Sequence, residues 1–186
     1  MTDIWRGRLV RLRGAEPSDW ETHYNWDQES ETVRMLDHAQ FPNSQARARR
    51  WAEETAARPL ENDEFFFIIE ALESGDEVGI INTHHCDPRV GSFSYGIGVI
   101  PERRRKGYAS QAILLVARYC FQELRYQKLN VQVHDDNAAS VALHERLGFT
   151  QEGRLRRNVY KAGRFHDMLC YGMTTEEFAA RHPDWL

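Results

Sequence analysis

The sequence lacks several features that would place it in a special class of proteins. Its 186 residues contain no uninterrupted apolar run of the roughly 18 to 20 residues that cross a membrane. The first residues, Met-Thr-Asp-Ile-Trp-Arg, show neither the basic nor the apolar region of a signal peptide. Internal repeats and Gly/Ser linkers are also missing. We therefore expect a single domain over residues 1–186, located in the cytoplasm and without a membrane partner.

Cysteine and excess positive charge are scarce as well. Cys86, Cys120 and Cys170 are odd in number and form no Cys-x-x-Cys pair, so neither a disulfide framework nor a thiolate metal site is expected. His84 and His85 are neighbours on a predicted strand and should point to opposite faces, so we expect no metal there either. The 24 basic and 28 acidic residues give a net charge of -4, which argues against a nucleic-acid partner held by phosphate neutralisation.

What is present is enough apolar material for a packed core, with 41% hydrophobic and 11% aromatic residues. Patterns typical of strands and helices alternate along the chain. Strands are predicted at residues 9–13, 64–71, 78–84, 92–100, 128–134, 149–160 and 165–173. Helices are predicted from residue 18, at 31–38, 44–57, 107–124 and 137–147, and from residue 174, with Ser18 and Glu21 at capping-box spacing. We expect a mixed α/β fold, a sheet of about seven strands flanked by helices.

The most specific local signal lies in residues 99–109, Val-Ile-Pro-Glu-Arg-Arg-Arg-Lys-Gly-Tyr-Ala, between a predicted strand and a predicted helix. A helix that begins directly after such a loop leaves backbone N–H groups unpaired, and these form an anion site. Gly107 permits close approach of the backbone, and Ala109 keeps the first turn small. Positive charge for an entering phosphate comes from Arg104, Arg105 and Lys106. The alternative is a solvated basic run that happens to precede a helix.

This loop resembles the pyrophosphate loop of the GNAT superfamily of acyl-CoA-dependent N-acyltransferases, Gln/Arg-x-x-Gly-x-Gly/Ala. Residues 104–109 match it, and residues 99–102 supply the usual Val-x-Pro-Glu. Residues 137–149 are similar to a second motif of the family, Asn-x-x-Ser/Ala-x-x-Leu-Tyr-x-x-x-Gly-Phe. The segments 152–156 and 163–167 resemble the branch with ribosomal-protein N-terminal and spermidine acetyltransferases. The resemblance implies acetyl-CoA as acyl donor and a sheet whose central strands splay apart.

The resemblance also implies which residues contact acetyl-CoA. They are Ile97, Gly98, Val99, Arg104, Arg105, Lys106, Gly107, Tyr108, Ala109, Ser110, Asn137 and Ser140. A backbone N–H of residues 97–99 would polarise the acyl carbonyl. Gly96 and Gly98 suit a bulge beside the bound arm, or simply accommodate the twist of the sheet. Asn137 is in addition a helix N-cap, a role that needs no ligand.

Catalysis is less well defined by the sequence. His144 stands where relatives often carry a Tyr that protonates the leaving thiolate, so the resemblance implies that His144 is the proton donor. The alternative is that His144 is a solvent-facing helix histidine and that Ser140 or a water donates the proton. Some relatives use a Glu as general base, but the matching residue here is Gln132. The candidates left open for the base are His84, His85, His134, Asp135 and Glu70, or a relay through water.

The resemblance implies transfer of an acetyl group to a primary amine: a protein N-terminal α-amine, a polyamine or a small amine. Residues 20–41 combine acidic and aromatic side chains, a composition suited to a cationic acceptor, although an ordinary exposed acidic helix face would look the same. A homodimer is also expected. The main alternative is a non-catalytic CoA-sensing or protein-binding module, because His144 and Gln132 both depart from the pattern of the family.

Overall fold

The structure is a computed structural model that describes residues 3–30, 33–34 and 41–185. The helix predicted at residues 31–38 lies largely outside these described residues. No helix of the described part is long and apolar enough to cross a membrane.

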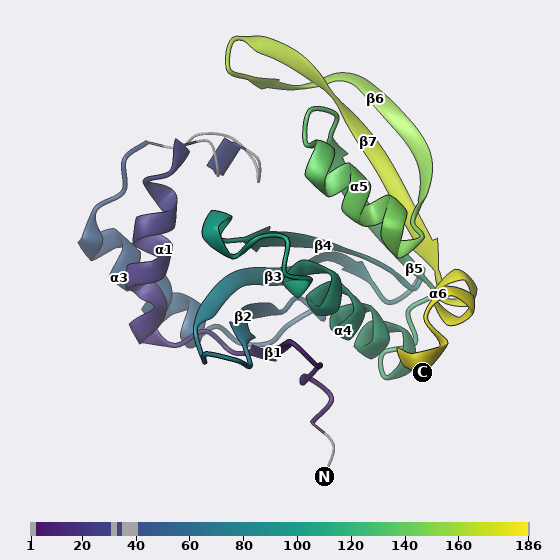
Figure 1. Cartoon of the computed structure of the whole chain (residues 1–186), viewed down its shortest axis with the longest axis horizontal. Helices are drawn as coiled ribbons and strands as arrows, with labels where there is room; N and C mark the ends of the chain where they lie inside the picture. Colours follow the sequence, from purple (N-terminus) through teal and green to yellow (C-terminus); the bar gives the residue numbers. More distant parts are fainter. Residues whose placement is uncertain (1–2, 31–32, 35–40, 186) are drawn as a thin grey trace. The chain divides into compact units, whose positions relative to one another are not determined.

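All seven predicted strands are present (Figure 1). They are β1 (Val10–Arg13), β2 (Phe66–Ala71), β3 (Glu77–Asp87), β4 (Ser92–Val99), β5 (Lys128–His134), β6 (Thr150–Lys161) and β7 (Arg164–Thr174). The helices are α1 (Trp20–Asp27), α3 (Gln45–Ala56), α4 (Tyr108–Gln122), α5 (Ala138–Leu147) and α6 (Thr175–Arg181), with short 3-10 turns at Pro17–Asp19, Pro101–Arg103 and Pro183–Trp185. The mixed α/β prediction is confirmed.

The strands form one sheet in the order β1-β2-β3-β4-β5-β7-β6. Four neighbouring pairs, β1 with β2, β2 with β3, β5 with β7 and β6 with β7, are antiparallel, whereas β4 and β5 are parallel. A parallel pair requires a crossover connection, and α4 provides it between these two strands.

The parallel pair is short. It joins Ser92, Phe93 and Ser94 of β4 to Lys128, Leu129 and Asn130 of β5. Along the described strands no further pair of β4 with β5 is recorded, although β5 continues to pair with β7 as far as His134. The expected splay of the central strands is therefore confirmed, and it begins after Ser94.

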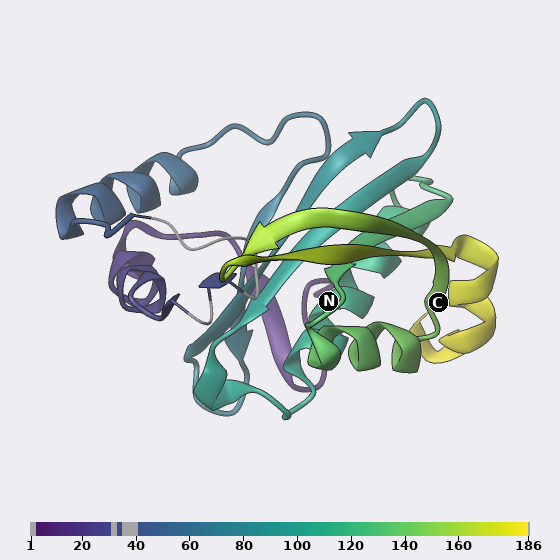
Figure 2. The same cartoon turned by 90° about the horizontal axis from the view of Figure 1, so that it is seen from above.

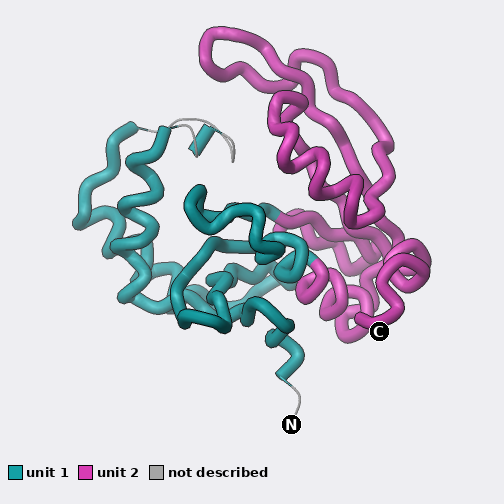
Figure 3. Tube along the Cα trace, in the orientation of Figure 1, with its two compact units in different colours: residues 1–83, 96–113 teal, residues 84–95, 114–186 magenta. Residues whose placement is uncertain are grey.

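The chain divides into two compact units, residues 1–83 with 96–113 and residues 84–95 with 114–186 (Figure 3). In unit 1, helices α1 and α3 pack side by side, and Ile68, Ile69 and Ile81 are fully buried in its core (Figure 1). Strands β3 and β4 contribute residues to both units. A single domain over residues 1–186 stays a prediction.

Unit 2 contains a long hairpin formed by β6 and β7 (Figure 2). Its core holds Phe93, whose ring centroid lies 5.8 Å from that of Phe121 on α4, and Phe121 in turn packs on Phe178 of α6 at 5.4 Å. The part of α4 in this unit also buries an apolar face, because Val116, Ala117 and Cys120, at helical spacing, are no more than 2% exposed.

Most of the predicted helix ends are confirmed. The side chains of Ser44, Asn137 and Thr174 each cap a helix, and Gly148 ends α5 with a left-handed φ of 91°. The predicted Ser18–Glu21 capping box is wrong. The box lies two residues earlier, between Glu16 and Asp19 at the 3-10 turn that precedes α1, where the Asp19 carboxylate accepts a hydrogen bond of 2.8 Å from the N–H of Glu16.

Candidate active site

The loop between β4 and α4 has the backbone of an anion site. Arg105 and Gly107 both have left-handed backbones, with φ of 65° and 85°, and α4 begins at the next residue, Tyr108. Alternating conformations of this kind turn successive N–H groups toward one side, and the first N–H groups of a helix have no partner within it. The loop therefore has the geometry of an anion site, and the pyrophosphate of acetyl-CoA stays its predicted ligand. The first bond within the helix runs from the N–H of Gln111 to the carbonyl of Gly107.

The side chains of the loop divide into exposed and engaged groups. Arg104, Arg105 and Lys106 are exposed, and their contact with a phosphate stays a prediction. The Arg104 Nε also donates to the carbonyl of Val99 at 3.0 Å, which braces the end of β4. The side chain of Tyr108 is buried and its hydroxyl donates to Glu73 at 2.6 Å, so its contact with acetyl-CoA stays a prediction. A contact of Tyr108 with acetyl-CoA would therefore use the backbone.

The turn between β2 and β3 holds this loop from the other side. Its carboxylates are Glu73, which accepts from Tyr108 and lies 3.6 Å from the Lys106 Nζ, and Asp76, which pairs with Arg103 at 2.7 Å. The hydrogen bond from Tyr108, followed by the charge of Lys106, lowers the pKa of Glu73. No local pattern in the sequence indicates these partners, which lie about thirty residues before the loop.

Gly79 on β3 is a further residue that the sequence analysis missed. A Cβ at this position would lie 2.2 Å from the carbonyl oxygen of Gly98. Only glycine therefore permits the approach of β3 to the segment Ile97, Gly98 and Val99 that is expected to line the acyl arm. The single signal in the sequence was a glycine inside an otherwise β-branched run. Ala109, Ser110 and the backbone roles of residues 97–99 stay predictions.

Unit 2 carries the second motif at the start of α5. The Asn137 Oδ1 accepts from the N–H of Ser140 at 3.1 Å, so the helix-capping role is confirmed. Contacts of Asn137 and Ser140 with acetyl-CoA stay predictions. Ser140 also meets His144, one turn further along the helix: its carbonyl oxygen lies 2.7 Å, and its Oγ 3.4 Å, from the His144 Nδ1.

His144 is not a solvent-facing residue, so that alternative is wrong: it is 1% exposed. Its ring lies among those of Tyr95, Phe149 and Tyr171, at centroid distances of 5.9, 5.1 and 6.2 Å. The Nε2 lies 2.6 Å from the hydroxyl oxygen of Tyr95. Burial lowers the pKa of His144 more than the bond to the Ser140 carbonyl raises it. The histidine is therefore neutral at pH 7, and its role as proton donor stays a prediction.

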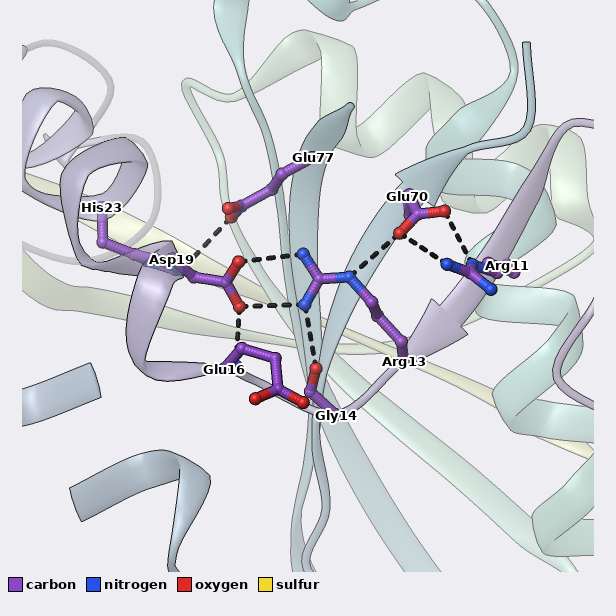
Figure 4. Close-up of polar contacts among 8 residues, drawn as sticks. All are labelled: Arg11, Arg13, Gly14, Glu16, Asp19, His23, Glu70 and Glu77. Atoms are coloured by element: carbon purple, nitrogen blue, oxygen red, sulfur yellow. Dashed lines mark hydrogen bonds and ion pairs between the residues drawn. The ribbon is translucent and has the colours of Figure 1, made fainter. Parts of the chain in front are cut away.

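Among the candidates for the general base, Glu70 is already engaged (Figure 4). Its carboxylate accepts two hydrogen bonds from Arg11, at 2.7 and 3.0 Å, and one from Arg13 at 3.0 Å. Arg13 in turn makes a two-point ion pair with Asp19, both bonds being 2.9 Å long. The hydrogen bond from Arg11 lowers the pKa of Glu70. This carboxylate therefore holds β1 and β2 together and is a poor base.

The remaining candidates lie in other contacts. The Nδ1 atoms of His84 and His85 are 3.1 Å apart, and the His134 Nδ1 lies 3.0 Å from the Lys161 Nζ. Asp135 lies 3.3 Å from the His166 Nδ1 and pairs with Arg154. None of these contacts identifies a base. Gln132 is exposed on β5 and offers no carboxylate.

Asp135, Asp136 and His166 have ligand atoms within 4.8 Å of one another, a spacing that a metal ion would accept. The Lys161 Nζ lies 2.7 Å from Asp136, however, and supplies positive charge to the same cluster. We assign no metal to it.

A strand that ends in a left-handed loop and a helix N-terminus is the arrangement expected of an acyl-CoA-dependent transferase at its donor site. The family model for the acetyltransferase (GNAT) domain matches residues 9–150. The chain therefore belongs to the GNAT acetyltransferase family and uses acetyl-CoA as its acyl donor.

Individual relatives agree with this assignment. The SPbeta prophage-derived uncharacterized N-acetyltransferase YokL of Bacillus subtilis is 42% identical over 96% of this chain and 97% of its own length. Spermidine N(1)-acetyltransferase of Escherichia coli K12 is 23% identical over 77% of this chain and 82% of its own. The crystal structure of spermidine N-acetyltransferase from Vibrio cholerae in complex with CoA and spermine is similar in fold, with a TM-score of 0.79 and 21% identity over 92% of this chain and 99% of that one.

Proposed function

We propose that the protein transfers an acetyl group from acetyl-CoA to a primary amine, either a protein N-terminal α-amine, a polyamine or a small amine. The observation that carries the donor half is the left-handed loop at Arg105 and Gly107, which opens directly into α4. Holding the amine beside the thioester supplies much of the rate, because well-oriented reactants gain roughly 7–11 kcal/mol in favourable cases.

The acceptor half rests on the charge of α1 and the residues that follow it. Glu21, Asp27 and Glu29 are exposed acidic side chains close together in the sequence. Asp19 belongs to the same acidic run but is buried against Arg13, so it does not contribute to drawing in a cation. Spermidine N(1)-acetyltransferase of Escherichia coli, a relative over most of the chain, is named for a cationic polyamine, which supports an acceptor of this kind.

A CoA-release assay over a panel of amines tests the proposal. The panel holds peptides with free N-termini, polyamines, amino acids and aminoglycosides, with carboxylate and hydroxyl compounds as controls. Turnover of any amine excludes the CoA-sensing or protein-binding module. Calorimetric binding of acetyl-CoA without any turnover would support that module, and turnover restricted to anionic or hydroxyl acceptors would contradict the amine.

Variants that remove one negative charge each test whether the acidic residues attract a cationic acceptor. Glu21→Gln and Glu29→Gln should each raise KM for a cationic acceptor by up to about fivefold, the range of about 0.2–1 kcal/mol for exposed charges. Glu123→Gln removes an equally exposed carboxylate after α4 and serves as control. The proposed homodimer and cytoplasmic location are checked by light scattering and by cell fractionation.

A further inference from the structure

Tyr95 and His144 form a buried hydrogen-bonded pair that no sequence motif announces. Tyr95 is 3% and His144 1% exposed, and the Tyr95 hydroxyl oxygen lies 2.6 Å from the His144 Nε2. The two residues are separated by 49 positions and lie on β4 and α5, both within unit 2. The pair therefore exists only in the folded chain.

The contacts of the imidazole settle where its proton lies. A backbone carbonyl only accepts hydrogen bonds, so the Nδ1 that lies 2.7 Å from the Ser140 carbonyl carries the proton. The neutral ring then has a lone pair at Nε2, and the Tyr95 hydroxyl donates to it. Neutral His144 therefore has no proton at Nε2 to give to a substrate, but it has a site there that takes one from Tyr95.

Tyr95 also occupies a distinctive position along β4. Ser94, paired with Asn130, is the last residue of this strand for which pairing with β5 is recorded. Tyr95 is the first residue after it, where the backbone of β4 is released from β5. A bound strand-like acyl arm would use the backbone of β4 beyond this point. Because the Tyr95 hydroxyl donates its hydrogen to His144, that bond uses neither lone pair of the Tyr95 oxygen.

We propose that Tyr95 is a catalytic residue that exchanges a proton with the reacting atoms, and that His144 acts through it as a positioning residue and proton store. The proposal rests on the proposed acetyl transfer to an amine. It assigns the base that the sequence leaves open at Gln132 and changes the role of His144 from direct donor to partner of Tyr95.

The proton path closes on itself. As the amine nitrogen bonds to the acyl carbon, it loses a proton to the Tyr95 oxygen, while the original hydroxyl proton of Tyr95 passes to the Nε2 of His144. As the carbon–sulfur bond breaks, its electron pair stays on sulfur. Tyr95 then gives a proton to that sulfur, and Nε2 returns its own proton to Tyr95. The products are the amide and the CoA thiol, the pair is restored, and nothing is oxidised or reduced.

The other groups around the imidazole do not offer this path. Tyr171 on β7 stacks on the ring, but its hydroxyl donates to Glu145 at 3.4 Å. Phe149 closes a further side of the ring and has no ionisable group. Among the described neighbours, Tyr95 is therefore the titratable group bonded to Nε2. Burial lowers the pKa of His144, which keeps Nε2 free to accept a proton at pH 7.

The test compares two tyrosines beside the same histidine. Tyr95→Phe removes the hydroxyl that meets Nε2, whereas Tyr171→Phe removes a hydroxyl that donates to Glu145 instead, on a tyrosine that is 2% exposed against 3% for Tyr95. We expect kcat with the best amine to fall by about 10²-fold or more in Tyr95→Phe, the usual contribution of a positioned acid or base, and to change by less than about twofold in Tyr171→Phe. Calorimetric affinity for acetyl-CoA should stay within about twofold in both. His144→Ala should lose about as much as Tyr95→Phe, and the double variant no more, because the two residues act as one unit.

The pH profile separates a proton path from simple packing. In the wild type, log kcat/KM should fall with a slope of one below the pKa of the amine and with a slope of two below the pKa of His144. Tyr95→Phe and His144→Ala should both keep a slope of one throughout. If the pair were merely structural, Tyr95→Phe would lower the rate at every pH and keep the second break, which is the change of slope at the pKa of His144. Additive losses of kcat in the double variant would also indicate a structural pair.

Three results would overturn the proposal. They are an unchanged kcat in Tyr95→Phe, an equal loss in Tyr171→Phe, and a second break that survives in Tyr95→Phe. Failure of the function itself is distinguishable, because the wild type would then release no CoA with any amine. In that case both the proposed function and the proton path are wrong. If the wild type turns over an amine and Tyr95→Phe is fully active, only the proton path is wrong.

Discussion

Replacement of Gly107 tests whether the loop before α4 receives the pyrophosphate. The residue has a φ of 85°, and a Cβ there would lie 3.2 Å from the Leu9 Cδ1. A left-handed backbone costs an L-residue about 1–2 kcal/mol, so Gly107→Ala should lower the free energy of unfolding by about that amount. Gly107→Asp should lose a similar amount and also place a carboxylate at the start of the helix.

The carboxylate is expected to act on binding. A charge about 6 Å from a charged pyrophosphate oxygen costs about 3 kcal/mol at an effective dielectric constant of about 20. This corresponds to about 100-fold in Kd, and less at high salt. The Kd of Gly107→Asp for acetyl-CoA should therefore exceed that of Gly107→Ala by about 100-fold at low ionic strength, because the two variants share the backbone strain and differ in charge.

Titration calorimetry with acetyl-CoA and urea unfolding measure the two effects separately. Gly163 is the matched control, because it has a similar φ of 81°, lies in the turn between β6 and β7, and has no atom within 4 Å of a Cβ built on it. Gly163→Asp should lose stability and keep its affinity for acetyl-CoA. Equal Kd values for Gly107→Ala and Gly107→Asp at low salt would refute the pyrophosphate assignment.

Two further predictions concern charged side chains. Arg104→Ala should weaken acetyl-CoA binding about tenfold in calorimetry, since it removes one charge-assisted contact of about 1.5 kcal/mol and leaves the N–H groups in place; a loss larger than that of Gly107→Asp would contradict this order. Asp19→Asn should lower the free energy of unfolding at pH 7 by about 2–3 kcal/mol, because the ion pair with Arg13 is lost. Burial would raise the pKa of Asp19, but the bonds from Arg13 and the Glu16 N–H outweigh it and lower the pKa. The stabilisation is therefore complete above the unfolded pKa of about 3.9 and disappears as the pH falls through the lower folded value, so urea unfolding at pH 7 and pH 3 should show the wild type and Asp19→Asn converging at acid pH.

Local signals predicted much of the fold and of the donor site. The cap at Asn137, the stop at Gly148 and the loop at Gly107 each depend on residues within one or two turns of the chain, and the structure has all three. Contacts between side chains that are distant in the sequence could not be predicted. The hydrogen bond between Tyr95 and His144 joins two elements that the sequence order keeps apart, and nothing in either segment alone indicates it.

The capping of α1 shows the same limit over a shorter range. Ser18 and Glu21 have the right spacing, but the box forms between Glu16 and Asp19, and the Asp19 carboxylate is also held by a tertiary ion pair with Arg13 on β1. Gly79 is a comparable case, because a side chain at this position is excluded by the backbone of β4 opposite, at Gly98.

The irregularity of β6 has a consequence for the behaviour of the protein at high concentration. This strand is the last in the sheet order, and its register with β7 shifts twice, between Gln151 and Gly153 and between Leu155 and Val159. Within the second shift, Arg157 has a left-handed φ of 55°. A straight edge strand of this length would offer a continuous template for strands of other molecules, whereas a kinked edge that carries exposed arginines opposes such pairing. Straightening the edge while neutralising its arginines should therefore make the protein aggregate more readily.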